Sequence, residues 1–109
     1  MIRQQYLESL ATMKRSLKKK RIKKYALKYD ELTGELLNLK TCEFSHIRSC
    51  AIYPQYSDNI ENGLIVNKTT HQLITHHEIN DEDQLLQLCS IQKWSLDWYE
   101  PFINLFENK

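Results

Sequence analysis

Two histidines and one asparagine, His46, Asn62 and His71, are the residues of this sequence best suited to chemistry. They lie in segment 42–78, which contains all four histidines of the chain. An imidazole exchanges its proton near neutral pH and can bind a metal ion when it is neutral. A general base and a bound divalent cation together meet the needs of phosphodiester hydrolysis, because the cation offsets the negative charge that develops in the transition state. Segment 42–78 is therefore the candidate site.

The residues around these side chains predict two strands joined by a loop. Residues 41–47 alternate loosely between apolar and polar, and residues 63–67 form a short apolar run, as strands do. The residues between them, 51–62, have the proline, serine, aspartate and asparagine content of a connecting loop. Such an open hairpin can present side chains from both ends of its loop at one place.

Helices are expected on both sides of this hairpin, and helix formers without Gly or Pro dominate the first of them. The expected helices cover residues 4–29, residues 70–75 after a cap at Asn67 or Thr69, a segment opened by Asp81 and Gln84, and a short segment that begins at Ser95 or Asp97. Thr33 and Gly34 predict a turn, and residues 36–40 a short strand or extended segment. The aromatic residues near the C-terminus, including Trp98 and Phe102, are typical of a core and not of a base-stacking surface.

The letters SHI at 45–47, NGLIV at 62–66 and a histidine nine positions after Asn62 resemble the HNH endonuclease family, in particular its branch with SHI, a proline, NGL and a later histidine. The similarity covers about 40 residues, 42–79. It implies the ββα-metal finger, a fold whose strand, loop, strand, helix order agrees with the order expected from the residues themselves.

The resemblance also implies a role for each matching position. His46 would be the general base, Asn62 would pin the loop and orient the base or the scissile phosphate, and His71 would bind a divalent metal, most simply Mg²⁺, with Mn²⁺ or Zn²⁺ as alternatives. Ser45 takes the place at which many relatives carry a second metal ligand. The implied activity is cleavage of DNA by a small nuclease, of a kind often encoded by phages or mobile elements.

Some positions differ from the family pattern around the metal. Ser45 is a weak ligand, and Thr75 stands where the family has a carboxylate. Other candidates for the missing ligand are Glu43, Asp58, His76 and His77, of which the two adjacent histidines are expected on the surface. Two alternatives therefore stay open: a nucleic-acid-binding or inhibitory protein that keeps the finger without its catalysis, and a structural zinc site built from Cys42, Cys50 and a histidine.

The charge of the chain is divided very unevenly. Residues 1–28 hold ten Lys and Arg against one Glu, a local charge of +9, although the whole chain carries only +1. A basic segment on an acidic body predicts contact with a polyanion, most simply the phosphate backbone of DNA. The residues expected to bind it are Arg15, Lys18, Lys19, Lys20, Arg21, Lys23 and Lys24.

Length and composition indicate a single α+β domain. At 109 residues, with 41% hydrophobic and 27% charged residues, the chain suits one modest core. The expected parts are a basic helix (1–29), an HNH-like ββα core (36–79) and C-terminal helices (81–107), with a homodimer possible through the terminal helices. Three cysteines without a CxxC pair and the lack of a long apolar run predict a cytoplasmic protein outside the membrane.

Overall fold

The computed structural model describes residues 3–107, which form an α+β fold with four α-helices and a two-stranded antiparallel sheet. The predicted fold class is confirmed at this level. In chain order the elements are α1 (Arg3–Tyr25), β1 (Glu43–His46), the 3-10 turn η1 (Pro54–Tyr56), β2 (Gly63–Val66), α2 (Lys68–His76), α3 (Glu82–Gln92) and α4 (Tyr99–Phe106).

The two strands pair with Glu43 opposite Val66 and His46 opposite Gly63. All four residues of β2 are buried, which explains why this strand is an unbroken apolar run. Because side chains alternate along a strand, Ile65 enters one core cluster while Leu64 and Val66 enter another on the opposite face. The sheet therefore separates two apolar layers.

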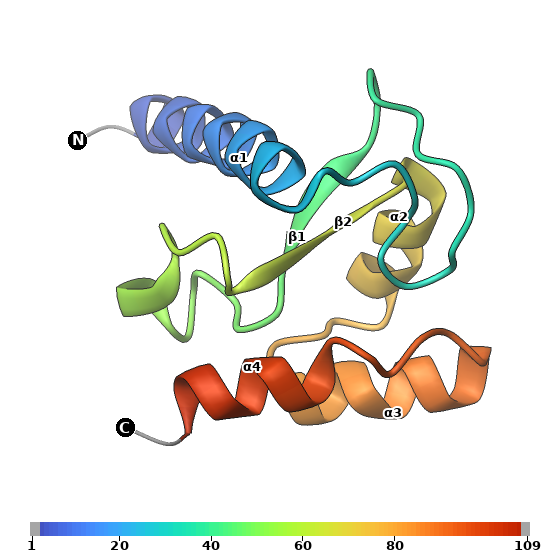
Figure 1. The fold of residues 1–109 in the computed structure, drawn as a ribbon. Coiled ribbons are helices and arrows are strands. Elements are labelled where there is room, and N and C mark those ends of the chain that lie inside the picture. Colours follow the sequence, from blue (N-terminus) through green and yellow to red (C-terminus); the bar gives the residue numbers. More distant parts are fainter. Residues whose placement is uncertain (1–2, 108–109) are drawn as a thin grey trace.

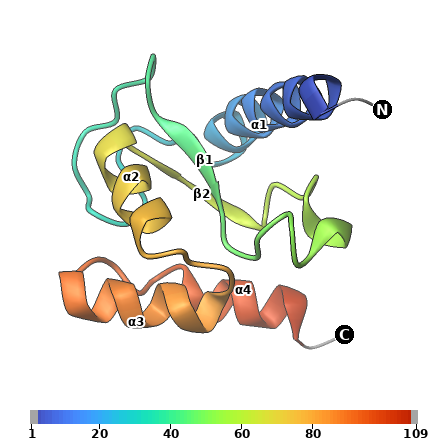
Figure 2. The same cartoon turned by 180° about the vertical axis from the view of Figure 1, so that it is seen from behind.

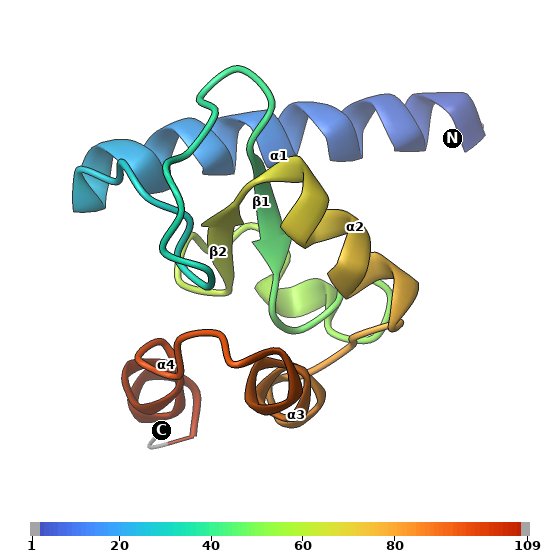
Figure 3. The same cartoon turned by 90° about the vertical axis from the view of Figure 1, so that its right-hand side faces the viewer.

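Helices cover both faces of the sheet. Figures 1 and 2 show α1 across one side of the strands and α3 with α4 on the other side. Leu17 of α1 packs with Phe44 and Ile65, whereas Trp98 and Phe102 join the core cluster that contains Leu64 and Val66. In Figure 3, α3 and α4 lie side by side beneath the sheet, and α2 lies beside β1. The aromatic residues near the C-terminus thus belong to the core, as predicted.

Two predictions before β1 were wrong in extent. The first helix ends at Tyr25 instead of 29, because Ala26 turns into the left-handed region with φ of 49°. Residues 36–40 form no strand; a single bridge joins Tyr29 and Leu36. The predicted turn is present, with Gly34 at φ of +77° and the Asp30 carboxylate accepting hydrogen bonds from the amides of Leu32 and Thr33.

Of the cap residues expected at the later helices, some cap their helix and others do not. Asp81 caps α3 by accepting from the amide of Gln84 at 2.9 Å. Asn67 precedes α2, but its side chain bonds the backbone of Asn38 and Leu36 and does not cap the helix. α4 begins at Tyr99, later than predicted. None of the described helices is both long enough and apolar enough to cross a bilayer.

Candidate functional site

A cleft of about 840 Å³ opens beside β1, and both predicted histidines line it. Its walls come from α1, β1, the turn after β1, α2 and the segment that leads into α3. His46 and Ser45 contribute from β1, His71 from α2 and Lys14 from α1. The two imidazoles, 25 positions apart in the sequence, therefore line one cleft.

His46 is half-buried, and one of its ring nitrogens is engaged. Its Nε2 lies 2.8 Å from the carbonyl oxygen of Ser57, in the loop after η1. A carbonyl only accepts hydrogen bonds, so Nε2 must carry the proton and the neutral ring keeps its lone pair on Nδ1. Burial lowers the pKa of His46 below its usual 6.5, the charges of Lys14 and His71 lower it further, and the bond to Ser57 opposes them. At neutral pH this histidine is a neutral base.

His71 pairs with Glu43, a residue that sequence reasoning left among several candidates. Nδ1 of His71 contacts Oε2 of Glu43, which brings an imidazole from α2 against a carboxylate from the first position of β1. Both side chains keep access to solvent, with 25% and 40% of their surfaces exposed. A nitrogen and an oxygen donor thus lie together beside the cleft that His46 lines.

The donor set fits a cation that binds few protein groups. Mg²⁺ usually keeps several waters and takes only one or two carboxylates together with substrate phosphates, and Mn²⁺ accepts the same oxygen donors as well as imidazole. Ser45 also lines the cleft, although only 6% of its surface is exposed. Across residues 3–107 no group of three or more His, Cys, Asp or Glu side chains gathers as a metal site, including around the three free cysteines.

Asn62 is fully buried at the foot of the loop and does not line the cleft. Its Oδ1 accepts from the amide of Arg48 at 2.9 Å, and its Nδ2 donates to the carbonyls of Arg48 and Tyr56 at 3.0 and 3.2 Å. The side-chain amide therefore bonds three backbone groups of the loop that follows His46. These bonds tie the loop together, and the Asn62 side chain does not reach the cleft.

Arg48 is the main residue of this region that sequence reasoning missed. Its guanidinium bonds both carboxylate oxygens of Glu82 at 2.9 and 2.7 Å and Glu107 at 2.6 Å, and it lies over the rings of Tyr53 and Tyr56. These hydrogen bonds raise the pKa of Arg48 and lower that of Glu82. Arg48 thereby fixes the loop after His46 to α3 and α4. A lone arginine beside the SHI letters gave no signal of this role.

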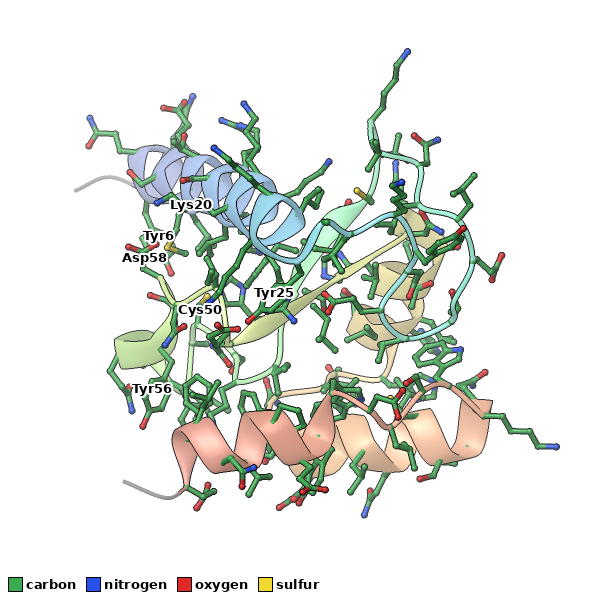
Figure 4. All side chains as sticks on the ribbon, in the orientation of Figure 1. Tyr6, Lys20, Tyr25, Cys50, Tyr56 and Asp58 are labelled. Atoms are coloured by element: carbon green, nitrogen blue, oxygen red, sulfur yellow. The ribbon has the colours of Figure 1, made fainter. Side chains whose placement is uncertain are left out.

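The basic residues of α1 do not form one uniform surface. Arg21 is only 8% exposed and bonds Glu31, Glu61 and the carbonyl of Ile60. Lys24 pairs with Glu61 at 2.7 Å. The charges of Arg21 and Lys24 are thus paired within the fold, and the expectation that these two residues bind nucleic acid stays a prediction. Lys20 turns to a separate hollow that Asp58 also lines (Figure 4).

Lys14, Arg15 and Lys18 lie earlier in α1 than Arg21 and Lys24. With Lys40 and Lys68 they line a hollow of about 480 Å³ that also contains Glu43 and His71. Lys19 and Lys23 are exposed and line neither this hollow nor the cleft. Of the seven cations expected to bind nucleic acid, Arg15 and Lys18 are therefore the two that lie beside the candidate site.

The remaining candidate ligands lie apart from His71 and Glu43. His76 is exposed at the end of α2 and does not line the cleft, as expected of a surface histidine, while His77 reaches the rim of the cleft. Asp58 lies in the loop before β2, on the side of Lys20. Glu43 is thus the candidate carboxylate that the fold brings to His71.

Comparison with protein-family models, with curated proteins and with solved structures found no match to this chain.

Proposed function

We propose that this protein is a metal-dependent endonuclease of the HNH type, which hydrolyses phosphodiester bonds in DNA. In this proposal β1, β2 and α2 form a ββα-metal finger. The observation that carries it is the shared cleft of His46 and His71, with Glu43 in contact with His71. A neutral base and one candidate metal ligand, His71, line the same cleft, and Glu43 joins His71 from the adjoining hollow. Hydrolysis of a phosphodiester needs a base and a bound cation close together in this way.

His46 acts as the general base. Its proton lies on Nε2, toward Ser57, so Nδ1 is free to take a proton from an attacking water. The backbone carbonyl holds the ring in this tautomer and orientation, as the partner of a catalytic histidine does in other hydrolases. Burial and the nearby charges of Lys14 and His71 keep the pKa low enough for the base to be neutral near pH 7.

His71 and Glu43 are the residues that would hold a divalent cation. When it is bound, such an ion polarises the phosphate and stabilises the charge that builds on the leaving oxygen. Glu43 adds the negative charge that Ser45 cannot supply, and it comes from the same strand as His46. Asn62 acts indirectly, since its three bonds to the loop keep Ser57 in place for His46.

A nicking assay on supercoiled plasmid tests the proposal. We expect cleavage with Mg²⁺ or Mn²⁺, its loss with a chelator, and a loss of about a hundredfold or more in His46→Ala. The matched control is His76→Ala, which removes an exposed imidazole that does not line the cleft. DNA binding without cleavage under every metal would favour a binding or inhibitory protein, and equal activity of the two variants would remove His46 from the mechanism.

The metal ligands have a test that does not depend on activity. A cation that binds the folded state alone raises the melting temperature with concentration. We expect Mn²⁺ to do so for the wild-type protein and for His76→Ala, and to have little effect on Glu43→Gln or His71→Ala. If Mn²⁺ raised the melting temperature of both of these variants as much as that of the wild-type protein, the metal would bind somewhere other than His71 and Glu43.

A further inference from the structure

A basic groove runs beside the cleft, formed by Lys14, Arg15 and Lys18 of α1, Lys40 of the loop before β1 and Lys68 at the start of α2. Its volume is about 480 Å³. Five cations from three separate parts of the chain converge here. Glu43 is the single acid among the groove-lining residues that the structure describes.

The four lysines of the basic groove are available to an external partner. Within residues 3–107, no ion pair joins any of them to a carboxylate. Lys40 and Lys68 are exposed, and Lys14 and Lys18 are partly exposed. By contrast Arg21 and Lys24, farther along α1, form ion pairs with Glu31 and Glu61. Unpaired cations held close together repel one another, and a polyanion relieves that repulsion.

The basic groove continues into the catalytic cleft. Lys14, Phe44 and His71 line both spaces, so the groove and the cleft share a wall. A chain of phosphates that lay against Lys18, Lys40 and Lys68 would reach His71 and Glu43 next, and then the space in front of His46. The positively charged side chains of the groove therefore extend to the edge of the cleft in which the proposed reaction takes place.

We propose that one strand of DNA lies along the basic groove, with its phosphates bound by Lys14, Lys18, Lys40 and Lys68. This inference rests on the proposed function, which supplies the reason for the path into the cleft. It moves the binding surface from the whole basic helix to one side of it, and it adds two lysines that lie outside α1. Phosphate contacts of this kind position the substrate and carry no base specificity.

The test measures binding of a fluorescent 20-base-pair duplex by anisotropy, in EDTA and at several KCl concentrations. We expect Lys40→Gln/Lys68→Gln to bind about tenfold more weakly and to lose about two units of the salt-dependence slope, since each phosphate contact contributes close to one. The matched control is Lys28→Gln/Lys93→Gln, which removes the same charge from two lysines outside the groove. Its affinity should fall less than about threefold.

Several outcomes would contradict the proposal that DNA binds in the basic groove. These are equal losses in the two double variants with intact melting, an equal or larger loss in Lys19→Gln/Lys23→Gln, and tighter binding to phosphatidylglycerol vesicles than to DNA. Plasmid cleavage that is unaffected by Lys40→Gln/Lys68→Gln would also overturn it while leaving the nuclease in place. Groove-dependent DNA binding without cleavage under any metal supports the groove and removes the nuclease assignment.

Discussion

Asn62 holds both backbone groups of Arg48: its Oδ1 accepts from the amide at 2.9 Å, and its Nδ2 donates to the carbonyl at 3.0 Å. Because the side chain is fully buried, Asn62→Ala leaves backbone groups of the loop without partners. We expect a loss of about 2 to 4 kcal/mol in the free energy of unfolding, measured by urea denaturation.

Asn62→Asp separates the hydrogen bonds from the volume of the side chain. A carboxylate can still accept from the amide of Arg48, but it cannot donate to the two carbonyls. We expect this variant to be at least as unstable as Asn62→Ala. Asn59→Ala is the control, since Asn59 is exposed and makes one local bond to Glu61. Equal stability of Asn59→Ala and Asn62→Ala would refute the role of Asn62 as the pin of the loop.

The strands and helix of the central segment were predictable because local signals and burial agree there. The apolar run at 63–66 becomes the doubly buried β2, and Asp81 and Gln84 make the expected cap of α3. No strand forms at 36–40, where a short strand or an extended segment was expected. Leu36 and Leu39 are exposed, at 70% and 59%, and no neighbouring strand extends the pairing beyond one bridge. A run of apolar residues in the sequence does not by itself show whether the segment will pair with another strand.

The candidate site was predictable only in part, for a similar reason. The order of His46, Asn62 and His71 could be recognised in the sequence. The residues that each side chain contacts depend on which distant segments pack together. Glu43 meets His71 because β1 and α2 are adjacent in space. Arg21 joins Glu31 and Glu61 because α1 crosses the sheet. Charge counting treats every lysine and arginine alike and cannot separate these cases.

The Arg48–Glu82 pair predicts that substituting Glu82 destabilises the protein much more than substituting Glu107. Glu82 shares a buried contact, with side-chain exposures of 8% for Arg48 and 10% for Glu82, whereas Glu107 is 53% exposed. Removing one partner of a buried pair leaves a charge without compensation, so Glu82→Gln should cost about 3 kcal/mol of unfolding free energy. Glu107→Gln should cost less than about 1 kcal/mol. Similar losses in the two variants would contradict a dominant Arg48–Glu82 contact.

Gly63 predicts a steric conflict within the hairpin. A Cβ at this position would lie 2.2 Å from Cε1 and Cζ of the Phe44 ring. The ring is buried and cannot move aside freely, so we expect Gly63→Ala to cost about 1 to 3 kcal/mol of unfolding free energy. In a double-mutant cycle with Phe44→Leu, the two losses should be less than additive. Fully additive losses would show that the ring does not oppose the new methyl group.

His46 predicts a dependence of stability and activity on pH. Its pKa is lowered in the folded state, chiefly by burial, so below 6.5 the unfolded chain binds the proton more readily than the folded one. The stability of the wild-type protein relative to His46→Gln should therefore be constant above this value and decrease as the pH falls through the lowered folded pKa. Urea denaturation of both proteins between about pH 5 and pH 8 measures the difference, and the other histidines cancel because both proteins contain them. His46 itself should not limit the rate of plasmid cleavage until the pH falls below the ordinary value of 6.5, because the neutral base persists there. A relative stability that increases toward acid would show that His46 gains a proton on folding, which contradicts the lowered pKa and the neutral state assigned to this base.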